Sequence, residues 1–498
     1  MLQRALMSAI VARFDRCRRE DPERPLIHLP GTGEAWSAAD IWDSHLSYAR
    51  RFTHAGIGPG QLVVSAAGNN PASVAVLLAC QTVGIALMPV DASTTLPEIL
   101  ALAERFGAAA LVLPSPMADS QRQLGNDGLV PLADGLWLLL RAEAARRAYK
   151  DTALLKLTSG STGAPKAALT SEAQLIADGL QIAEAMEIRA ADTQMAAIPL
   201  SHSYGLGVLL MPLLVQGTAI VLRHSFVPPQ LPADARRFGA RIFPGVPFMF
   251  QYFVTNPPAG GWPAGLQRLM SAGAPLTPAI VRGFHGLFGV KIHSFYGTTE
   301  TGGIAFDRDD EIQEGSAVGR ALPGVTITLR EDADMPNGAG RIHVRSAAVA
   351  HGYSGHPGEG FDDAGYLTGD YGTLDSCGRL TLTGRVSSFV SVAGRKVQPH
   401  EVEEALRSMP GVDDVRVLAA TDARRGQQIV ACLVVDKASA GISVFDVRRF
   451  CGSRLAPHKI PRTIIFLDAI PLTPRGKTDR AALDTIVRAH LGGPLTAL

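Results

Sequence analysis

The stretch LKLTSGSTGAPKAAL, residues 155–169, joins an apolar run to a second apolar run through a loop of small and hydroxyl-bearing residues that ends in a lysine. Such a loop suits a phosphate, because its glycines let backbone N–H groups approach anionic oxygens that larger residues would obstruct. It is not a GxxxxGK[ST] loop, because Pro165 stands where the second glycine belongs. Taken alone, it also fits a flexible Ser/Gly turn, so other segments must decide. The candidate phosphate-binding residues are Thr158, Ser159, Gly160, Ser161, Thr162, Gly163 and Lys166.

Around this loop, short apolar runs alternate with longer helical patterns. Ser171 and Gln174 have the spacing of a capping box, which predicts a helix just beyond the loop. The alternation predicts the α/β fold class, with a large N-terminal domain of layered α/β subdomains. Strands are predicted at the apolar runs 61–65, 109–113, 196–200 and 219–222.

Beyond Leu380 the pattern changes to smaller units. It predicts helices near 399–409 and 444–455 and strands near 412–420 and 428–435. These elements indicate a compact α+β domain at the C-terminal end of the chain. The predicted domains are residues 1–384 and residues 385–498.

Composition excludes several classes of protein. The 498 residues include 47 Lys and Arg against 46 Asp and Glu, so no broad field points to nucleic acid or to an anionic membrane. Five scattered cysteines without CxxC spacing predict reduced thiols in a cytoplasmic protein and no zinc cluster.

Two apolar segments need separate interpretation. The first 20 residues carry Leu2, Leu6, Ile10 and Phe14 at helical spacing among arginines, without the apolar core of a signal peptide. We expect a helix docked on its own protein, with a membrane-surface helix as the alternative. The run 74–90 is too interrupted to span a bilayer and predicts a helix, a turn at Gly84 and a strand.

Three further segments carry polar groups suited to a nucleotide. In FYGTTETGG, residues 295–303, Tyr296 can stack on a base and Glu300 can hold a divalent cation that bridges phosphates. In GYLTGD, residues 365–370, Asp370 can accept hydrogen bonds from a ribose diol. In PLTPRGKTDR, residues 471–480, Lys477 can extend from a rigid base. Singly, each is better explained by core packing, a solvated or turn-forming acid, or a surface lysine.

Together, the segments resemble the adenylate-forming superfamily of acyl- and aryl-CoA synthetases, peptide-synthetase adenylation domains and firefly-type luciferases. The resemblance covers nearly the whole chain in the family's order. The remaining matching segments are PLSHSYGLG at 199–207, SAGAPL at 271–276, GSAVGRALPG at 315–324 and GRVSSFVSVAGRKVQPHEVE at 384–403.

The resemblance assigns a role to each matching residue. The loop from Thr158 with Lys166 would wrap the β- and γ-phosphates of ATP, and Thr299 would contact the α-phosphate. Glu300 would bind Mg²⁺, and Lys477 would be the catalytic lysine that neutralises charge between the two reacting anions. The adenine would lie against Gly273, Ala274, Pro275 and Tyr296, and the ribose against Asp370 and Arg385.

The resemblance also implies a reaction in two steps. An acyl adenylate forms with loss of pyrophosphate, and the acyl group then moves to the thiol of coenzyme A or of a carrier-protein phosphopantetheine. The small domain is expected to be mobile, rotating about Ser387 to present the loop at Gly394 and Lys396 to the thiol. Ser387 and Ser388 replace the charged pair usual in the family, which leaves the balance of the two conformers open.

The acid itself is left open. PLSHSYGLG has no aspartate near His202 to hold an ammonium group, which favours an acid without one. The resemblance implies that His202 and Val246, the latter within 244–252, border the acyl pocket, and fatty, aryl and hydroxy acids all fit. A structural histidine and ordinary core packing are the alternatives for these positions. An acyl-AMP ligase dedicated to a carrier protein is the near alternative. A non-catalytic homologue that binds nucleotide or acyl ligand is the alternative from a different class.

Overall fold

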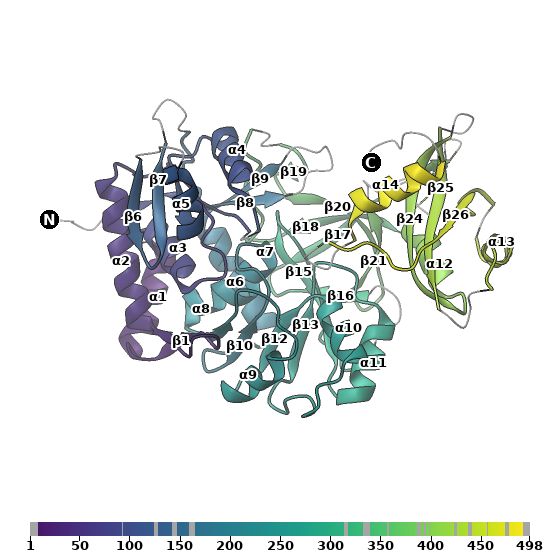
Figure 1. Cartoon of the computed structure of the whole chain (residues 1–498), viewed down its shortest axis with the longest axis horizontal. Helices are drawn as coiled ribbons and strands as arrows, with labels where there is room; N and C mark the ends of the chain where they lie inside the picture. Colours follow the sequence, from purple (N-terminus) through teal and green to yellow (C-terminus); the bar gives the residue numbers. More distant parts are fainter. Residues whose placement is uncertain are drawn as a thin grey trace. The chain divides into compact units, whose positions relative to one another are not determined.

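The computed structural model describes residues 8–91, 93–123, 128–141, 147–158, 165–312, 317–331, 339–355, 358–385, 390–392, 395–397, 399–422, 426–436, 441–455, 457–473 and 478–491. Contacts within it divide the chain into two compact units (Figure 1). The first comprises Met1–Ile327, His343–Leu367 and Ser376–Leu380, and the second comprises Thr328–Ile342, Thr368–Asp375 and Thr381–Leu498. The second unit thus includes two segments that precede residue 385, and the boundary between 384 and 385 stays a prediction.

The first unit contains a seven-stranded sheet in which β5, β3, β4 and β8 run parallel. Antiparallel strands β7 and β6 extend it at one edge and β9 at the other. In sheet order, the strands are β6 (Leu129–Ala133), β7 (Leu136–Leu140), β5 (Ala110–Pro114), β3 (Leu62–Ser65), β4 (Ala86–Pro89), β8 (Leu154–Thr158) and β9 (Lys166–Thr170).

This sheet is buried on both faces, as its nearly continuous apolar strands require. Along β3, Val63 packs into one core while Leu62 and Val64 pack into another. Helix α4 (Leu96–Phe106) covers the second core with Ile99 among its buried side chains. Alternate residues of one short strand therefore contribute to two layers of the fold.

Nine consecutive strands of a second sheet also lie in the first unit. Six of them, β1, β11, β10, β12, β13 and β14, run parallel, so their carboxyl ends lie along one edge. In sheet order, the nine strands are β16 (Ala317–Ala321), β15 (Gly302–Phe306), β14 (Ile292–Thr298), β13 (Arg268–Ser271), β12 (Ile242–Gly245), β10 (Thr193–Ala196), β11 (Ala219–Leu222), β1 (Pro25–His28) and β2 (Ala35–Ser37).

One predicted strand is misplaced. The run 196–200 was expected to be extended in the sheet, but β10 ends at Ala196 and the chain leaves the sheet there. Pro199, without an N–H group, cannot donate to a ladder. The strand instead lies upstream and includes the buried Gln194, whose amide donates to the Val208 carbonyl at 3.0 Å.

Helices fill the space between the two sheets, and one apolar core joins them (Figure 1). Helix α1 (Ala9–Glu20) buries Ile10 and Phe14 completely, which confirms the docked helix for the residues described. Helix α3 (Pro71–Val83) ends at Gly84 with φ +79° before β4, as predicted. The other helices of this unit are α2 (Ala38–His54), α5 (Ser115–Gln123), α6 (Glu172–Ala185), α7 (Ser203–Gly205), a π-helical turn (Leu206–Leu210), α8 (Met211–Gln216), α9 (Leu231–Arg237), α10 (Pro247–Thr255) and α11 (Pro278–Phe288).

The C-terminal part of the second unit is a five-stranded sheet with helices on both faces. Val402 and Val447 pack on one face, and Leu483 and Val487 pack on the other. This confirms the α+β character of the segment. Its elements are β22 (Val390–Val392), β23 (Arg395–Val397), α12 (Pro399–Arg407), β24 (Val412–Asp422), β25 (Gly426–Val435), α13 (Val444–Gly452), a 3₁₀ turn (Pro457–Lys459), β26 (Thr463–Phe466) and α14 (Arg480–Leu491).

Four more strands are hydrogen-bonded in the order β17 (Thr326–Glu331), β18 (Gly340–Arg345), β20 (Gly365–Leu374) and β21 (Arg379–Arg385), and β19 (Phe361–Asp362) pairs with β20.

Within the described ranges, no helix has the length and apolar character needed to cross a bilayer.

Candidate active site

Three of the predicted site segments meet at the carboxyl edge of the second sheet. Val246 follows β12, Gly273 follows β13 and Tyr296 lies within β14, in three strands that are neighbours in the sheet. Gly273 has φ +80°, and a Cβ built on it would lie 3.8 Å from Cγ1 of Val246. Ligands of α/β sheets bind outside the carboxyl ends of parallel strands, so this edge is the expected place for a nucleotide.

The two sides of this edge differ in exposure. Tyr296 is 8% exposed, whereas the segment Gly273, Ala274 and Pro275 is exposed to solvent. The segment that was predicted to line the adenine is therefore open to solvent beside a mostly buried aromatic ring.

The PLSHSYGLG segment lies beside the same strands. The Tyr204 hydroxyl donates to the Met270 carbonyl at 3.3 Å, and its ring lies 5.7 Å from that of Phe295. His202 precedes α7, and its Nε2 is 3.1 Å from Oδ2 of Asp91, which follows β4. The motif itself has no acid, but the fold brings one to His202 from 111 residues away. The absence of an acid from the motif therefore does not mean that no carboxylate lies beside His202, and the preference for an acid without an ammonium group stays a prediction.

Glu300 lies in the turn between β14 and β15 and is only 8% exposed. Its Oε1 accepts a hydrogen bond from the Tyr353 hydroxyl at 2.6 Å, and the Tyr353 and Tyr366 hydroxyl oxygens are 2.9 Å apart. Burial first, and then the charge of Glu300, raise the pKa of Tyr353. The tyrosine therefore remains a hydrogen-bond donor to the carboxylate.

This carboxylate fits a magnesium ion held jointly with a substrate. Among the described residues, nothing hydrogen-bonds its second oxygen, Oε2. No group of three or more His, Cys, Asp and Glu side chains in the described part of the chain could form a complete metal cage. Magnesium usually takes one or two carboxylates together with phosphate oxygens, so Glu300 alone is a sufficient protein ligand.

Lys166 and Thr158 face each other at the end of the β8–β9 hairpin, where they form the last cross-strand pair. The loop that they enclose, with Ser159, Gly160, Ser161, Thr162 and Gly163, lies outside the described residues. The Lys166 ammonium forms a 2.5 Å ion pair with Glu359 and lies 5.7 Å from the centre of the Tyr353 ring. Tyr353 therefore contacts both the predicted phosphate lysine and the predicted metal ligand.

The sequence reading missed two charged residues beneath this site. Lys156 on β8 is 6% exposed and Asp178 on α6 is 5% exposed. Burial lowers the pKa of Lys156 and raises that of Asp178, while each one's charge acts against the shift of the other. A lysine inside an apolar strand was the available signal for the first. Nothing in the local sequence distinguishes Asp178 or Tyr353.

The predicted ribose residues lie together in the second unit. Nε of Arg385 donates to Oδ1 of Asp370 at 2.5 Å, with the arginine side chain 64% exposed and the aspartate side chain 8% exposed. Lys396 is opposite Ser391 in the β22–β23 hairpin. The side chain of Lys396, and Ser387, Gly394 and Lys477 entirely, lie outside what the structure describes.

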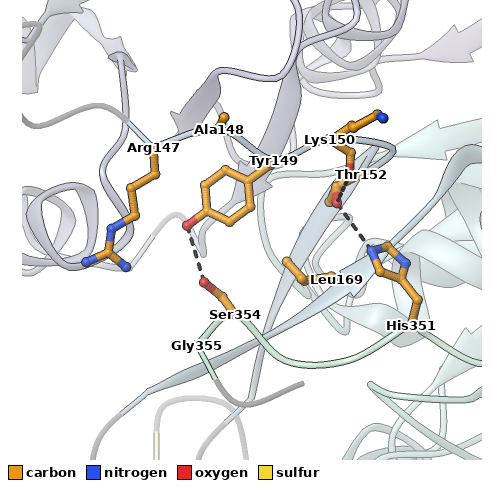
Figure 2. A pocket seen from close by; sticks show the side chains of 9 residues that line it. All are labelled: Arg147, Ala148, Tyr149, Lys150, Thr152, Leu169, His351, Ser354 and Gly355. Atoms are coloured by element: carbon orange, nitrogen blue, oxygen red, sulfur yellow. Dashed lines mark hydrogen bonds between the residues drawn. The ribbon is translucent and has the colours of Figure 1, made fainter. Parts of the chain in front are cut away.

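A shallow cavity of about 400 Å³ lies near the opposite end of the β8–β9 hairpin from Thr158 and Lys166. Figure 2 shows that Arg147 and Lys150 extend to opposite sides of it, so their charges do not converge. The hydroxyl groups that line the cavity are hydrogen-bonded to neighbouring side chains. The Tyr149 hydroxyl is paired with that of Ser354 at 3.3 Å, and the Thr152 hydroxyl with the His351 ring at 3.4 Å. None of the predicted site residues lines it.

Two family models match successive parts of the chain. Residues 14–354 match the model of the AMP-binding enzyme family, and residues 401–477 match that of the AMP-binding enzyme C-terminal domain. Among curated proteins, the sulfoacetate–CoA ligase of Cupriavidus necator is 29% identical over 93% of this chain and 94% of its own length. A feruloyl-CoA synthase of an Amycolatopsis species is 27% identical over 93% and 96%.

Solved structures of similar length share the fold. ATP-bound MatB from Rhodopseudomonas palustris superposes with a TM-score of 0.81 at 25% identity, over 95% of this chain and 98% of its own. The amide bond synthetase McbA from Marinactinospora thermotolerans superposes with a TM-score of 0.80 at 25% identity, over 96% and 99%.

Proposed function

Because the chain belongs to the family of AMP-binding enzymes, we propose that it joins a carboxylic acid to a thiol in two steps driven by ATP. In the first step a carboxylate oxygen attacks the α-phosphorus, the bond to pyrophosphate breaks and an acyl adenylate forms. In the second the thiolate attacks the acyl carbon, AMP leaves with the electrons of the C–O bond, and the thiol proton passes to solvent. The chain is thus an AMP-forming acid–thiol ligase.

The observation that carries this proposal is the buried Glu300 carboxylate at the carboxyl edge of the sheet. It keeps one oxygen on Tyr353 and the other without a hydrogen bond from any described residue. A magnesium ion bound there supplies charge neutralisation for the phosphates. Lys166 holds the β- and γ-phosphates with the loop that begins at Thr158, and Thr299 contacts the α-phosphate.

The other predicted residues divide the remaining tasks. Tyr296 stacks on the adenine, with Gly273, Ala274 and Pro275 at its edge, and Asp370 and Arg385 hold the ribose. His202 and Val246 border the acyl group. Lys477 neutralises the approaching anions, and rotation about Ser387 replaces it by the thiol-side loop of Gly394 and Lys396. Positioning and charge compensation thus account for the chemistry.

We propose coenzyme A as the acceptor thiol, because the curated relatives above bear names of CoA ligases and synthases. We also propose a cytoplasmic location. The five cysteines are all free, which fits a reducing compartment. The acids in the relatives' names, sulfoacetate and ferulate, differ in size and charge, so they do not single out one substrate class.

The deciding experiment is acid-dependent release of pyrophosphate from ATP, over a panel of fatty, aryl, hydroxy, sulfonated and amino acids, each with and without coenzyme A. One acid class that releases pyrophosphate, with an acyl-CoA product, is the expected result. Release without any acyl-CoA would favour a carrier-protein acceptor. ATP binding with no release for any acid would favour the non-catalytic alternative. Glu300→Gln is the control that should raise the magnesium requirement.

A further inference from the structure

Three charged side chains from three separate elements are each more than nine-tenths buried around the turn of Glu300. Lys156 comes from β8, Asp178 from α6 and Glu300 from the β14–β15 turn, with exposed fractions of 6%, 5% and 8%. Buried charges are costly unless they are compensated. Here one lysine lies among two carboxyl groups, so the acidic side chains of the group outnumber the basic one.

The Asp178 side chain contacts the backbone of the residues that follow Glu300. Its Oδ1 accepts a hydrogen bond from the Gly303 N–H at 2.8 Å. A Cβ on Gly302, where φ is +69°, would come within 2.2 Å of the same oxygen. The turn can approach the carboxylate this closely only because residue 302 is glycine. The position of Asp178 is therefore coupled to that of the turn which carries Thr299 and Glu300.

Lys156 lies on β8, the first strand of the β8–β9 hairpin. It is the cross-strand partner of Ala168, which in turn bridges to Tyr353, the residue that donates to Glu300. Its charge interacts with the carboxylates of both Asp178 and Glu300. Among the described residues, none hydrogen-bonds its ammonium or forms an ion pair within 4.0 Å of it. Its influence on the two carboxylates is thus electrostatic, without direct contact, and acts in a mostly buried site.

We propose that Lys156 and Asp178 are positioning residues that set the electrostatic potential at Glu300 and hold its turn. The inference rests on the proposed role of Glu300 as the magnesium-binding carboxylate. Lys156 opposes the approach of a cation to Glu300, and Asp178 compensates Lys156. The pair leaves Glu300 as the carboxylate available for the metal, while Asp178 remains hydrogen-bonded to the Gly303 N–H.

The sign of this effect gives a test that a purely structural role does not reproduce. Asp178→Asn leaves Glu300 as the one carboxylate that offsets the ammonium, so the lysine repels a cation more strongly and divalent-metal affinity should fall, by about three- to tenfold. Lys156→Met removes the opposing charge, so that affinity should rise. The double variant should return close to the wild-type value, and Lys156→Arg, which keeps the charge, should stay near it throughout.

Two readouts apply to each variant. The first is binding of Mn²⁺ in the presence of ATP and the absence of acid, measured by electron paramagnetic resonance. The second is the magnesium dependence of pyrophosphate release, resolved into the half-saturating concentration and kcat. Thermal unfolding without ligands identifies any variant that fails to fold. If Lys156→Met does not fold, the comparison of Asp178→Asn with the double variant still decides.

The proposal is supported if the two single variants change the metal affinity in opposite directions and the double variant restores the wild-type affinity. Shifts in the same direction, or an unchanged metal dependence in all folded variants, overturn it. If the wild type releases no pyrophosphate with any acid, the proposed function fails instead. The Mn²⁺ measurement then still tests the charge pair, because it requires only ATP binding.

Discussion

Lys166 and Glu359 form a 2.5 Å ion pair, although they are separated by 193 residues in the chain. The lysine side chain is 16% exposed and the glutamate side chain is 55% exposed. If Lys166 binds the phosphates of ATP, the nucleotide must displace Glu359 from it. The glutamate is therefore a competitor of the substrate for one cation.

Replacing Glu359 with Gln should tighten ATP binding. An exposed ion pair contributes little, so the dissociation constant should fall by about two- to fivefold. Isothermal titration with ATP and magnesium, without acid, measures it. Glu187→Gln is the matched control, because Glu187 is likewise an exposed glutamate in an ion pair, here with Arg268. Unchanged or weaker binding in Glu359→Gln would show that the two groups do not compete.

Replacing Tyr353 with Phe should lower kcat/KM by about ten- to 150-fold. The variant keeps the ring but removes the hydroxyl that donates to Oε1 of Glu300 at 2.6 Å, and a hydrogen bond to a charged group contributes about 1.5–3 kcal/mol. The half-saturating magnesium concentration should change as well. The control is Tyr366→Phe, which removes the partner of the Tyr353 hydroxyl and should have a smaller effect. Equal effects of the two variants would contradict the direct role of Tyr353.

Much of the fold could be predicted from the sequence because it depends on local patterns. The capping box at Ser171 and Gln174, the left-handed Gly84 and the apolar strand 219–222 are written in adjacent residues. The strand predicted at 196–200 was wrong because hydrophobicity alone was weighed there. The actual strand contains Gln194, whose polar group is satisfied by the distant Val208, and no local pattern reveals that contact.

In the candidate site, too, local motifs could be predicted from the sequence and long-range contacts could not. Glu300, Tyr296 and Lys166 lie in recognisable motifs, whereas their partners come from distant parts of the chain. Tyr353 reaches Glu300 across 53 residues and Asp91 reaches His202 across 111. Such partners depend on which strands are neighbours, and strand order cannot be read from hydrophobic periodicity. For this reason the electrostatic surroundings of a motif are less predictable than the motif.

Replacing Asp370 with Asn should raise KM for ATP by about tenfold if Asp370 accepts hydrogen bonds from the ribose. The same substitution removes the negative charge that faces Arg385 at 2.5 Å. Deoxyadenosine triphosphates separate the two consequences. Wild-type enzyme should discriminate against 2′-deoxy- or 3′-deoxy-ATP, and the variant should discriminate much less. Asp414→Asn, at another aspartate–arginine pair of the second unit, is the control. Undiminished discrimination in Asp370→Asn would remove the residue from the ribose site.

His45 should make the stability of the protein depend on pH. Its ring is fully buried on α2, with Nδ1 at 2.5 Å from the Trp42 carbonyl and Nε2 without a partner in the described structure. Burial lowers its pKa from 6.5 to about 4. The folded chain therefore keeps the imidazole neutral between these values, with Nδ1–H donating to Trp42, while the unfolded chain takes up a proton.

Because the unfolded state binds more protons in that window, the free energy of unfolding should fall as the pH drops from 6.5 towards 4. The contribution of His45 is fully present above pH 6.5, and about 3 kcal/mol is lost by pH 4. Urea unfolding of wild type and His45→Leu at a series of pH values measures it. As the pH falls, the wild type should lose stability relative to His45→Leu. His54→Gln, at an exposed position of the same helix, should follow the wild type. A difference between wild type and His45→Leu that stays constant from pH 7 to pH 4.5 would show that the buried ring does not remain neutral.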